Sequence, residues 1–93
     1  MRKLFRTNRF KKDQKRETKG VHKKTLSVDL QTLVDLLLAD TVLPVHYRDH
    51  AMTGDYKDCR DVHLKPDLVL IYRKVGETEL QLIRLGSHSE LSI

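Results

Sequence analysis

Histidine and aspartate side chains gather in the second half of the chain. Four of the five histidines lie there with several carboxylates, as His46, Asp49, His50, Asp61, His63, Asp67 and His88. Because an imidazole has an unperturbed pKa of about 6.5, two histidines can act as base and acid in one reaction near neutral pH. Such a pair suits phosphodiester cleavage in RNA: the base deprotonates a 2′-OH that attacks the neighbouring phosphorus, and the acid protonates the leaving 5′-oxygen.

The same chemistry needs a cation, because negative charge develops on the phosphate. Arg84 precedes Gly86 and His88 by a few residues and is the candidate for this role. No glycine-rich phosphate-binding loop is present in the sequence. A cation from Arg84 would therefore be the main support for a phosphate near His88.

A metal site is a second possible use of these residues. Its ligands would be His46 and His50, four residues apart, together with Cys59, Asp61 and His63. Pro44 makes a helix over residues 46–50 doubtful, and neither Cys-x-x-Cys nor His-Glu-x-x-His occurs in the sequence. This interpretation is weaker than acid–base chemistry.

Two further alternatives concern single residues. Cys59 could act as a nucleophile near Asp61 and His63, although no oxyanion loop accompanies it. Any one histidine could instead be an ordinary surface residue, and we expect this for His22, which stands alone among basic residues.

Positive charge is concentrated at the N-terminus. Residues 1–24 hold eleven Lys and Arg against Asp13 and Glu17, a balance of +9, whereas residues 25–93 have a balance of −4. A segment this basic favours a polyanion or an acidic protein as partner, although a solvated helix face is the simpler alternative. The candidate contacts to such a negatively charged partner or substrate are Lys11, Lys12, Lys15 and Arg16.

Two helices are expected in the first half, after a short strand over residues 3–6. Thr7 or Asn8 would cap a basic helix over residues 9–19, which Gly20 ends. A second helix would start at Thr25 or Ser27 and end before Pro44. Its apolar stripe has a helical period and packs in the core, through Leu26, Leu30, Leu33 and Leu37.

Three strands are expected in the second half. From residue 57 the pattern has period two, which places Cys59, Asp61 and His63 on one face. The apolar run 68–72 is typical of a central strand, and residues 79–85 form the next strand. We therefore predict an α+β fold with a short N-terminal strand, two helices on one face of a mostly antiparallel four-stranded sheet, and a short C-terminal helical turn. The other face would be open to a substrate.

Length and composition indicate one domain over residues 1–93. The chain has 93 residues, 39% of them hydrophobic, and its single cysteine cannot form an internal disulfide. No apolar stretch follows the basic start, and the apolar run 33–39 is too short to span a bilayer. We expect a soluble cytoplasmic protein with no membrane association.

Three sequence segments between residues 47 and 91 carry a specific resemblance. They read YRDHAMTG at 47–54, RDVHLKPDL at 60–68 and, after Ile71 and Tyr72, RLGSHSEL at 84–91. In order and spacing they resemble the YafQ-like branch of the RelE toxin superfamily, which comprises ribosome-associated mRNA endonucleases of bacterial toxin–antitoxin pairs. The first half of the chain matches this RelE-like domain only in the kind of elements expected.

The resemblance implies a role for each matching histidine. His50 would be the general base or would position the attacking 2′-OH, and His63 would contact the phosphate or stabilise the transition state. His88 would be the general acid. The reasoning from residues alone leaves open whether His50 or a carboxylate is the base.

The resemblance also assigns the remaining residues. Asp61 lies beside His63, Asp67 would orient or tune one of the histidines, and Arg84 would stabilise the phosphate. No metal or other cofactor is implied, and RNA is the expected substrate because DNA lacks the 2′-OH. The family usually has an aromatic residue four positions after the last histidine, where this chain has Ser92.

The partners implied by the resemblance are an antitoxin and the translating ribosome. The cognate antitoxin would be acidic, of the ribbon-helix-helix type, and its C-terminal segment would cover the basic surface. Operator DNA would be bound only through the complex, which represses its own operon, and the basic helix would contact ribosomal RNA. The alternative is a non-catalytic module that retains the fold and binds RNA or the antitoxin.

Overall fold

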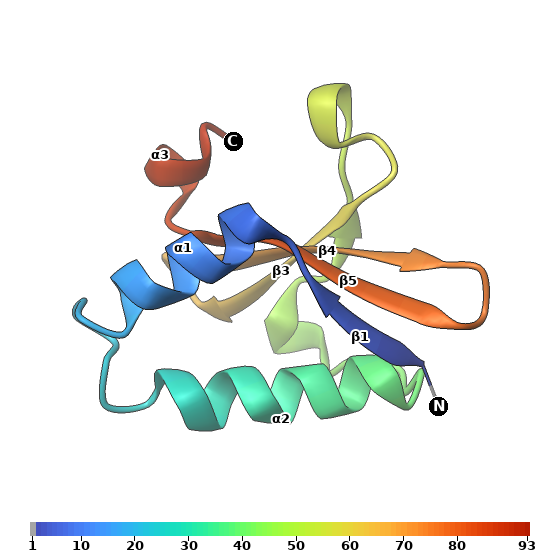
Figure 1. Ribbon diagram of the computed structural model, residues 1–93, viewed down its shortest axis with the longest axis horizontal. Helices are drawn as coiled ribbons and strands as arrows, with labels where there is room; N and C mark the ends of the chain where they lie inside the picture. Colours follow the sequence, from blue (N-terminus) through green and yellow to red (C-terminus); the bar gives the residue numbers. More distant parts are fainter. Residues whose placement is uncertain (1) are drawn as a thin grey trace.

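The computed structural model describes residues 2–93, which form one sheet with helices on both sides (Figure 1). The elements are, in chain order, β1 (Lys3–Arg6), α1 (Asn8–Glu17), α2 (Leu26–Leu38), η1 (Val45–Tyr47), β2 (His50–Ala51), η2 (Gly54–Tyr56), β3 (Arg60–Lys65), β4 (Leu68–Val75), β5 (Glu79–Gly86) and α3 (His88–Leu91). The α+β class, the two long helices and the C-terminal turn predicted from the sequence are confirmed.

The sheet has five strands in the order β1-β5-β4-β3-β2, not the four predicted. The last three strands form the expected antiparallel meander, and β1 adds parallel to β5. The missed strand is β2, which pairs His50 with Asp61 and Ala51 with Arg60 at the edge of β3. Two residues are too few to show a period in the sequence, so only the pairing with β3 reveals this strand.

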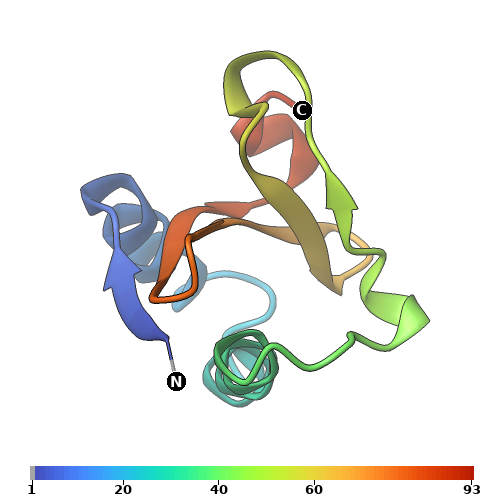
Figure 2. The ribbon, with the colours of Figure 1, turned by 90° about the vertical axis from the view of Figure 1, so that its right-hand side faces the viewer.

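The main core lies between α2 and one face of the sheet. The predicted stripe of α2 is buried, and Leu33 and Leu37 are at most 1% exposed. Phe10 of α1 belongs to the same core cluster. The Thr7 hydroxyl caps this helix by accepting a hydrogen bond from the Phe10 amide at 3.0 Å, which fixes the first turn of α1. Figure 2 shows α2 end-on beneath the sheet. Packing of the apolar sheet face against α2 holds the strands in place. The strands in turn set the positions of the residues on the opposite face.

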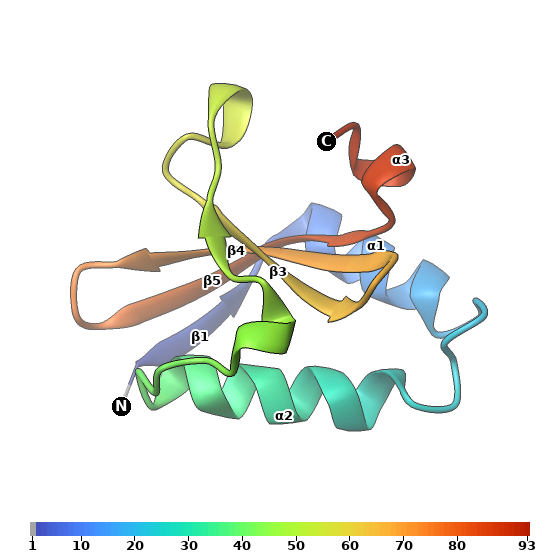
Figure 3. The same ribbon diagram turned by 180° about the vertical axis from the view of Figure 1, so that it is seen from behind.

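The opposite face of the sheet is only partly covered. A small cluster of Cys59, Val69, Ile71 and Leu91 lies on it, so α3 closes part of the surface that the sequence predicted to be open. The segment that includes η2 and the C-terminal α3 stand on this side of the sheet, away from α2 (Figures 1 and 3). No helix within residues 2–93 is long and apolar enough to cross a membrane.

Candidate active site

A hollow of about 860 Å³ lies on the face of the sheet opposite α2. Its walls come from the start of α1, from β2 and η2, from β3 and β5, and from the C-terminal residues 91–93. His50, Asp61 and Arg84 line it, so three of the residues predicted from the sequence meet at one surface. The short β2 strand is what brings His50 to this position.

His50 and Asp61 form a close pair across β2 and β3. Nδ1 of His50 lies 2.8 Å from the carbonyl oxygen of Arg48 and 3.0 Å from Oδ1 of Asp61. The carbonyl is the hydrogen-bonded acceptor, whereas Oδ1 of Asp61 is buried and has no hydrogen bond from residues 2–93. Because a carbonyl can only accept, Nδ1 carries the proton, and Nε2 of neutral His50 keeps its lone pair.

His63 and His88 form a second pair, at the next position of the same face along β3, and neither lines the hollow. Their ring centroids are 5.2 Å apart, with the planes at 52°. His63 lies two residues beyond Asp61 on β3 and therefore points to the same face, as the period-two pattern predicted. β3 thus places Asp61 under His50, and His63 against His88.

A capping box fixes the helix that carries His88. The Ser87 hydroxyl accepts a hydrogen bond from the Glu90 amide at 3.1 Å, and the Glu90 carboxylate accepts one from the Ser87 amide at 2.9 Å. The backbone bond to Ser87 is the main reason why the pKa of Glu90 lies below its usual value. His88 is the first residue of α3, so this box fixes the backbone from which its ring projects.

Arg84 is held by a buried carboxylate of α1. Its Nε and Nη2 donate to Asp13 at 2.7 and 3.2 Å, and the Leu85 amide donates to the same carboxylate at 3.0 Å. Burial alone would raise the pKa of Asp13, but these hydrogen bonds and the charges of Arg84 and Arg16 bring it below its usual value. The clamp fixes Arg84 at the wall of the hollow.

Arg16 is occupied by contacts within the protein. It donates to Asp13 and Glu17 at 3.0 Å each and to the Leu85 carbonyl at 2.8 Å, and it pairs with Glu90 of α3 at 3.0 Å. The sequence grouped Arg16 with the substrate-binding lysines, but in the structure it joins α1 to β5 and α3. Lys11, Lys12 and Lys15 are exposed on the same helix.

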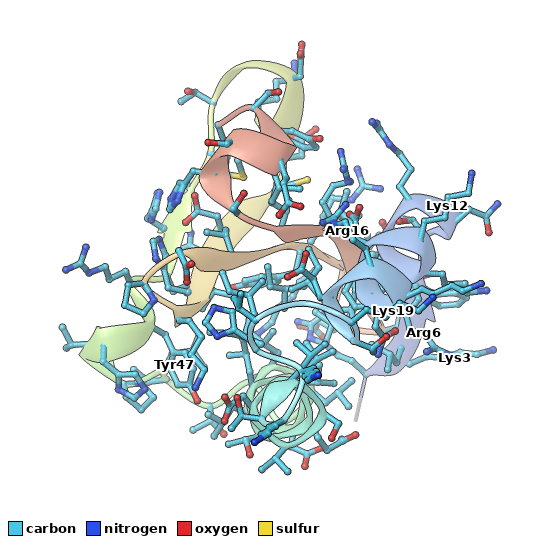
Figure 4. The ribbon with its side chains drawn as sticks, turned by 90° about the vertical axis from the view of Figure 1, so that its left-hand side faces the viewer. Lys3, Arg6, Lys12, Arg16, Lys19 and Tyr47 are labelled. Atoms are coloured by element: carbon cyan, nitrogen blue, oxygen red, sulfur yellow. The ribbon has the colours of Figure 1, made fainter. Side chains whose placement is uncertain are left out.

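Several basic side chains of the N-terminal segment share one side of the molecule. Lys3 and Arg6 project from β1, Lys12 from α1 and Lys19 from the turn after α1, whereas Tyr47 lies at the opposite side (Figure 4). Arg9 of α1 lines the hollow, so the basic segment reaches its wall.

Asp67 does not contact the site histidines that the sequence singled out. It lies in the turn between β3 and β4, and its Oδ1 is 3.0 Å from Nε2 of His22. His22, which the sequence indicated to be an ordinary surface residue, is therefore the partner of Asp67. This contact ties the connection between α1 and α2 to the sheet.

The alternative chemistries find less support. Within residues 2–93 no three His, Cys, Asp or Glu side chains are grouped to hold a metal ion. Cys59 is 7% exposed, and burial raises the pKa of its thiol, so its nucleophilic thiolate form is disfavoured. His46 stacks against Tyr47 in η1, with centroids 4.3 Å apart, and does not line the hollow.

Comparison with known proteins assigns the chain to a family. Residues 2–93 match the family described as "Bacterial toxin of type II toxin-antitoxin system, YafQ". The chain belongs to the YafQ toxin family. The resemblance first found in residues 47–91 thus extends over the basic N-terminal half.

Relatives in the YafQ family show the same fold. The mRNA interferase toxin YafQ of Escherichia coli K12 is 41% identical over 63 residues, which cover 67% of each protein. The chain spans about two thirds of the length of the curated relatives it matches. The crystal structures of YafQ from E. coli strain BL21(DE3) and of the E. coli DinJ–YafQ complex are 32% and 33% identical, with TM-scores of 0.84 and 0.83, and each comparison covers 98% of both chains.

Two residues of this YafQ-family site, Asp13 and Tyr56, were not singled out in the sequence, and Asp49 was grouped with the histidines without a role of its own. Asp13 shares a helical face with Phe10, three residues earlier, and this spacing was the available signal that its carboxylate is buried. Asp49 accepts hydrogen bonds from Tyr72 and Arg60 and so anchors the segment before His50. Burial and the bond to Asp49 raise the pKa of the Tyr72 hydroxyl, which therefore stays protonated as a donor. Tyr56 lines the hollow, and no pattern in the sequence marked it.

Proposed function

We propose that this YafQ-family protein is an mRNA endonuclease, the toxin of a type II toxin–antitoxin pair. The observation that carries the proposal is the arrangement along β3, where one strand face brings His50 to Asp61 and His63 to His88, while Arg84 lines the same hollow as His50 and Asp61. The name of the E. coli relative, mRNA interferase toxin, supports the same activity. Cleavage would use acid–base chemistry with no metal.

His50 is the proposed general base. Its Nδ1–H is held by the Arg48 carbonyl, with Asp61 3.0 Å away, which leaves Nε2 free to take the proton of the 2′-OH. The Asp61 carboxylate, 3.0 Å from Nδ1, stabilises the imidazolium that forms, because the two groups then carry opposite charges. The oxygen then attacks phosphorus, and the bond to the 5′-oxygen breaks.

His88 is the proposed general acid, and His63 contacts the phosphate. The exposed His88 can reach the leaving 5′-oxygen, and its neighbour His63 donates to a non-bridging oxygen. Arg84 stabilises the charge of the pentacoordinate phosphorus, and the Asp13 clamp holds it in place before the substrate arrives. Asp67 is given no step in this reaction, because its carboxylate pairs with His22 and not with a histidine of the site.

The exposed lysines of α1 are proposed to contact ribosomal RNA and, in the inhibited state, an acidic antitoxin. The solved DinJ–YafQ complex supports a protein partner for this family member, and a ribbon-helix-helix antitoxin would add operator binding and repression of the operon. The cytoplasm, where messages are translated, is the proposed location.

Replacing Lys11, Lys12 and Lys15 together by alanine should weaken RNA binding uniformly across sequences. Each phosphate that the protein no longer neutralises lowers the slope of log K against log salt concentration by about 0.7 to 0.9, so the slope of the triple variant should be smaller by about 2. Titrating ribosomes with the protein at several salt concentrations measures this slope. Lys74→Ala, which removes a lysine paired with Asp40, is the control and should leave the slope unchanged. An equal slope in the triple variant contradicts the proposed contact.

The activity itself is tested by expressing the chain without an antitoxin and mapping a reporter mRNA by primer extension. Cuts at defined in-frame positions, together with growth arrest, are expected. Intact message with normal growth would overturn the proposal and favour the non-catalytic binding module. Binding of RNA to the purified chain distinguishes that module from an inactive protein.

A further inference from the structure

The hollow is lined by more residues than the proposed reaction uses. His50, Asp61 and Arg84 are the lining residues with a role in the proposed reaction. The segment after β2 and the C-terminal residues line the rest, with apolar surface from Met52, Tyr56, Leu91 and Ile93 next to the polar Thr53, Asp55 and Ser92. The proposed cleavage uses none of these side chains, so they are available to another part of the substrate.

Tyr56 is the aromatic residue of this part of the hollow. Its ring packs against the cluster of Cys59, Val69, Ile71 and Leu91, and it is half-buried while it lines the hollow. The ring is therefore supported from behind and accessible from the front. A supported aromatic face is the usual platform on which proteins bind an unpaired nucleobase.

Tyr56 also stands close to the group proposed to bind phosphate. Tyr56 and Arg84 line the same hollow, Tyr56 from η2 and Arg84 from β5. A nucleobase on Tyr56 would thus keep its own phosphate within reach of Arg84. A hollow of about 860 Å³ is within the range of sites that take a ligand of this size.

We propose that Tyr56 forms a nucleobase-binding subsite, in which its ring stacks on the base next to the scissile phosphate. The inference rests on the proposed RNA cleavage and adds how the substrate is held. Because every base has a π face, stacking explains affinity and position without requiring a fixed sequence. The competing role for Tyr56 is purely structural, as packing for the Ile71 and Leu91 side chains.

The test uses a short RNA that carries 2-aminopurine next to a 2′-deoxy position, so that it binds but cannot be cut. Stacking on Tyr56 should quench its fluorescence in the unmodified protein and in Tyr56→Phe. In Tyr56→Leu the quenching should disappear, and affinity should fall about 5- to 150-fold. Phe5→Leu removes an aromatic ring that is 41% exposed on β1, outside the hollow, and is the matched control with unchanged quenching.

A second measurement does not depend on the leucine variant folding. The chain has three tyrosines, so fluorotyrosine labelling gives three ¹⁹F resonances, and the one missing in Tyr56→Phe belongs to Tyr56. Only this resonance should shift when the probe binds, because Tyr72 is 2% exposed in the core and Tyr47 packs against the α2 side of the sheet.

Three results would overturn the subsite: no binding of the probe, quenching in Tyr56→Leu equal to the unmodified protein, or no shift of the Tyr56 resonance. The result of the cleavage assay does not depend on these three results. A quenched probe without cleavage of mRNA would refute the proposed activity and keep the subsite, and cleavage without stacking would do the reverse.

Discussion

Replacing His88 by alanine should slow RNA cleavage by about 10²- to 10⁴-fold, the usual contribution of a positioned general acid. Without the imidazole the 5′-oxygen must leave as an unprotonated, high-energy anion. The ring is exposed and the turn of α3 depends on Ser87 and Glu90, so folding should be unchanged. Primer extension in cells and single-turnover cleavage of a ribosome-bound message in vitro measure the loss.

His46→Ala is the matched control for His88→Ala. His46 is an exposed histidine that contacts Tyr47 in η1, outside the hollow, and its removal should leave cleavage unchanged. Binding of a cognate antitoxin should be equal in both variants and in the unmodified protein. If His88→Ala cuts as fast as His46→Ala, another group protonates the leaving oxygen and the assignment of His88 is wrong.

Elements with a long periodic pattern could be predicted from the sequence. The stripe Leu26, Leu30, Leu33, Leu37 indicates α2, because apolar side chains at helical spacing have one way to be buried together. The period of two at Asp61 and His63 likewise places both residues on one strand face. This strand supplies Asp61 and His63, and His50 and His88 reach the site by contacts with these two residues, from β2 and α3.

Contacts between distant segments could not be predicted in the same way. β2 has two residues, and its existence depends on pairing with β3 rather than on its own sequence. Asp13 and Arg84 are 71 positions apart, and His22 and Asp67 are 45 apart. Spacing along the chain carries no information at that distance: the position of Asp13 three residues after Phe10 indicates a shared helical face, but not that Arg84 is its partner.

Replacing Asp13 by alanine should destabilise the protein strongly. Asp13 is 4% exposed and accepts from Arg16, Arg84 and the Leu85 amide, so its removal leaves the Arg84 guanidinium and a buried amide without their partner. Loss of one member of a buried ion pair costs about 3–5 kcal/mol. In a domain of this size thermal unfolding should start about 12 °C lower or more. Asp55→Ala, an exposed carboxylate, is the control and should unfold at the temperature of the unmodified protein.

The contribution of Asp13 to the free energy of unfolding should also depend on pH, and it should decrease in acid. Its pKa in the folded protein lies below the usual 3.8, so the unfolded chain binds the proton more readily. The stability that Asp13 supplies is therefore complete above about pH 4 and is lost as the pH falls through the lowered folded pKa. Denaturant unfolding of Asp13→Asn and the unmodified protein should differ most at neutral pH, and the difference should shrink in acid. Parallel stability curves down to about pH 2 would mean that Asp13 is held by packing alone, and Arg84 would then be positioned by some other contact.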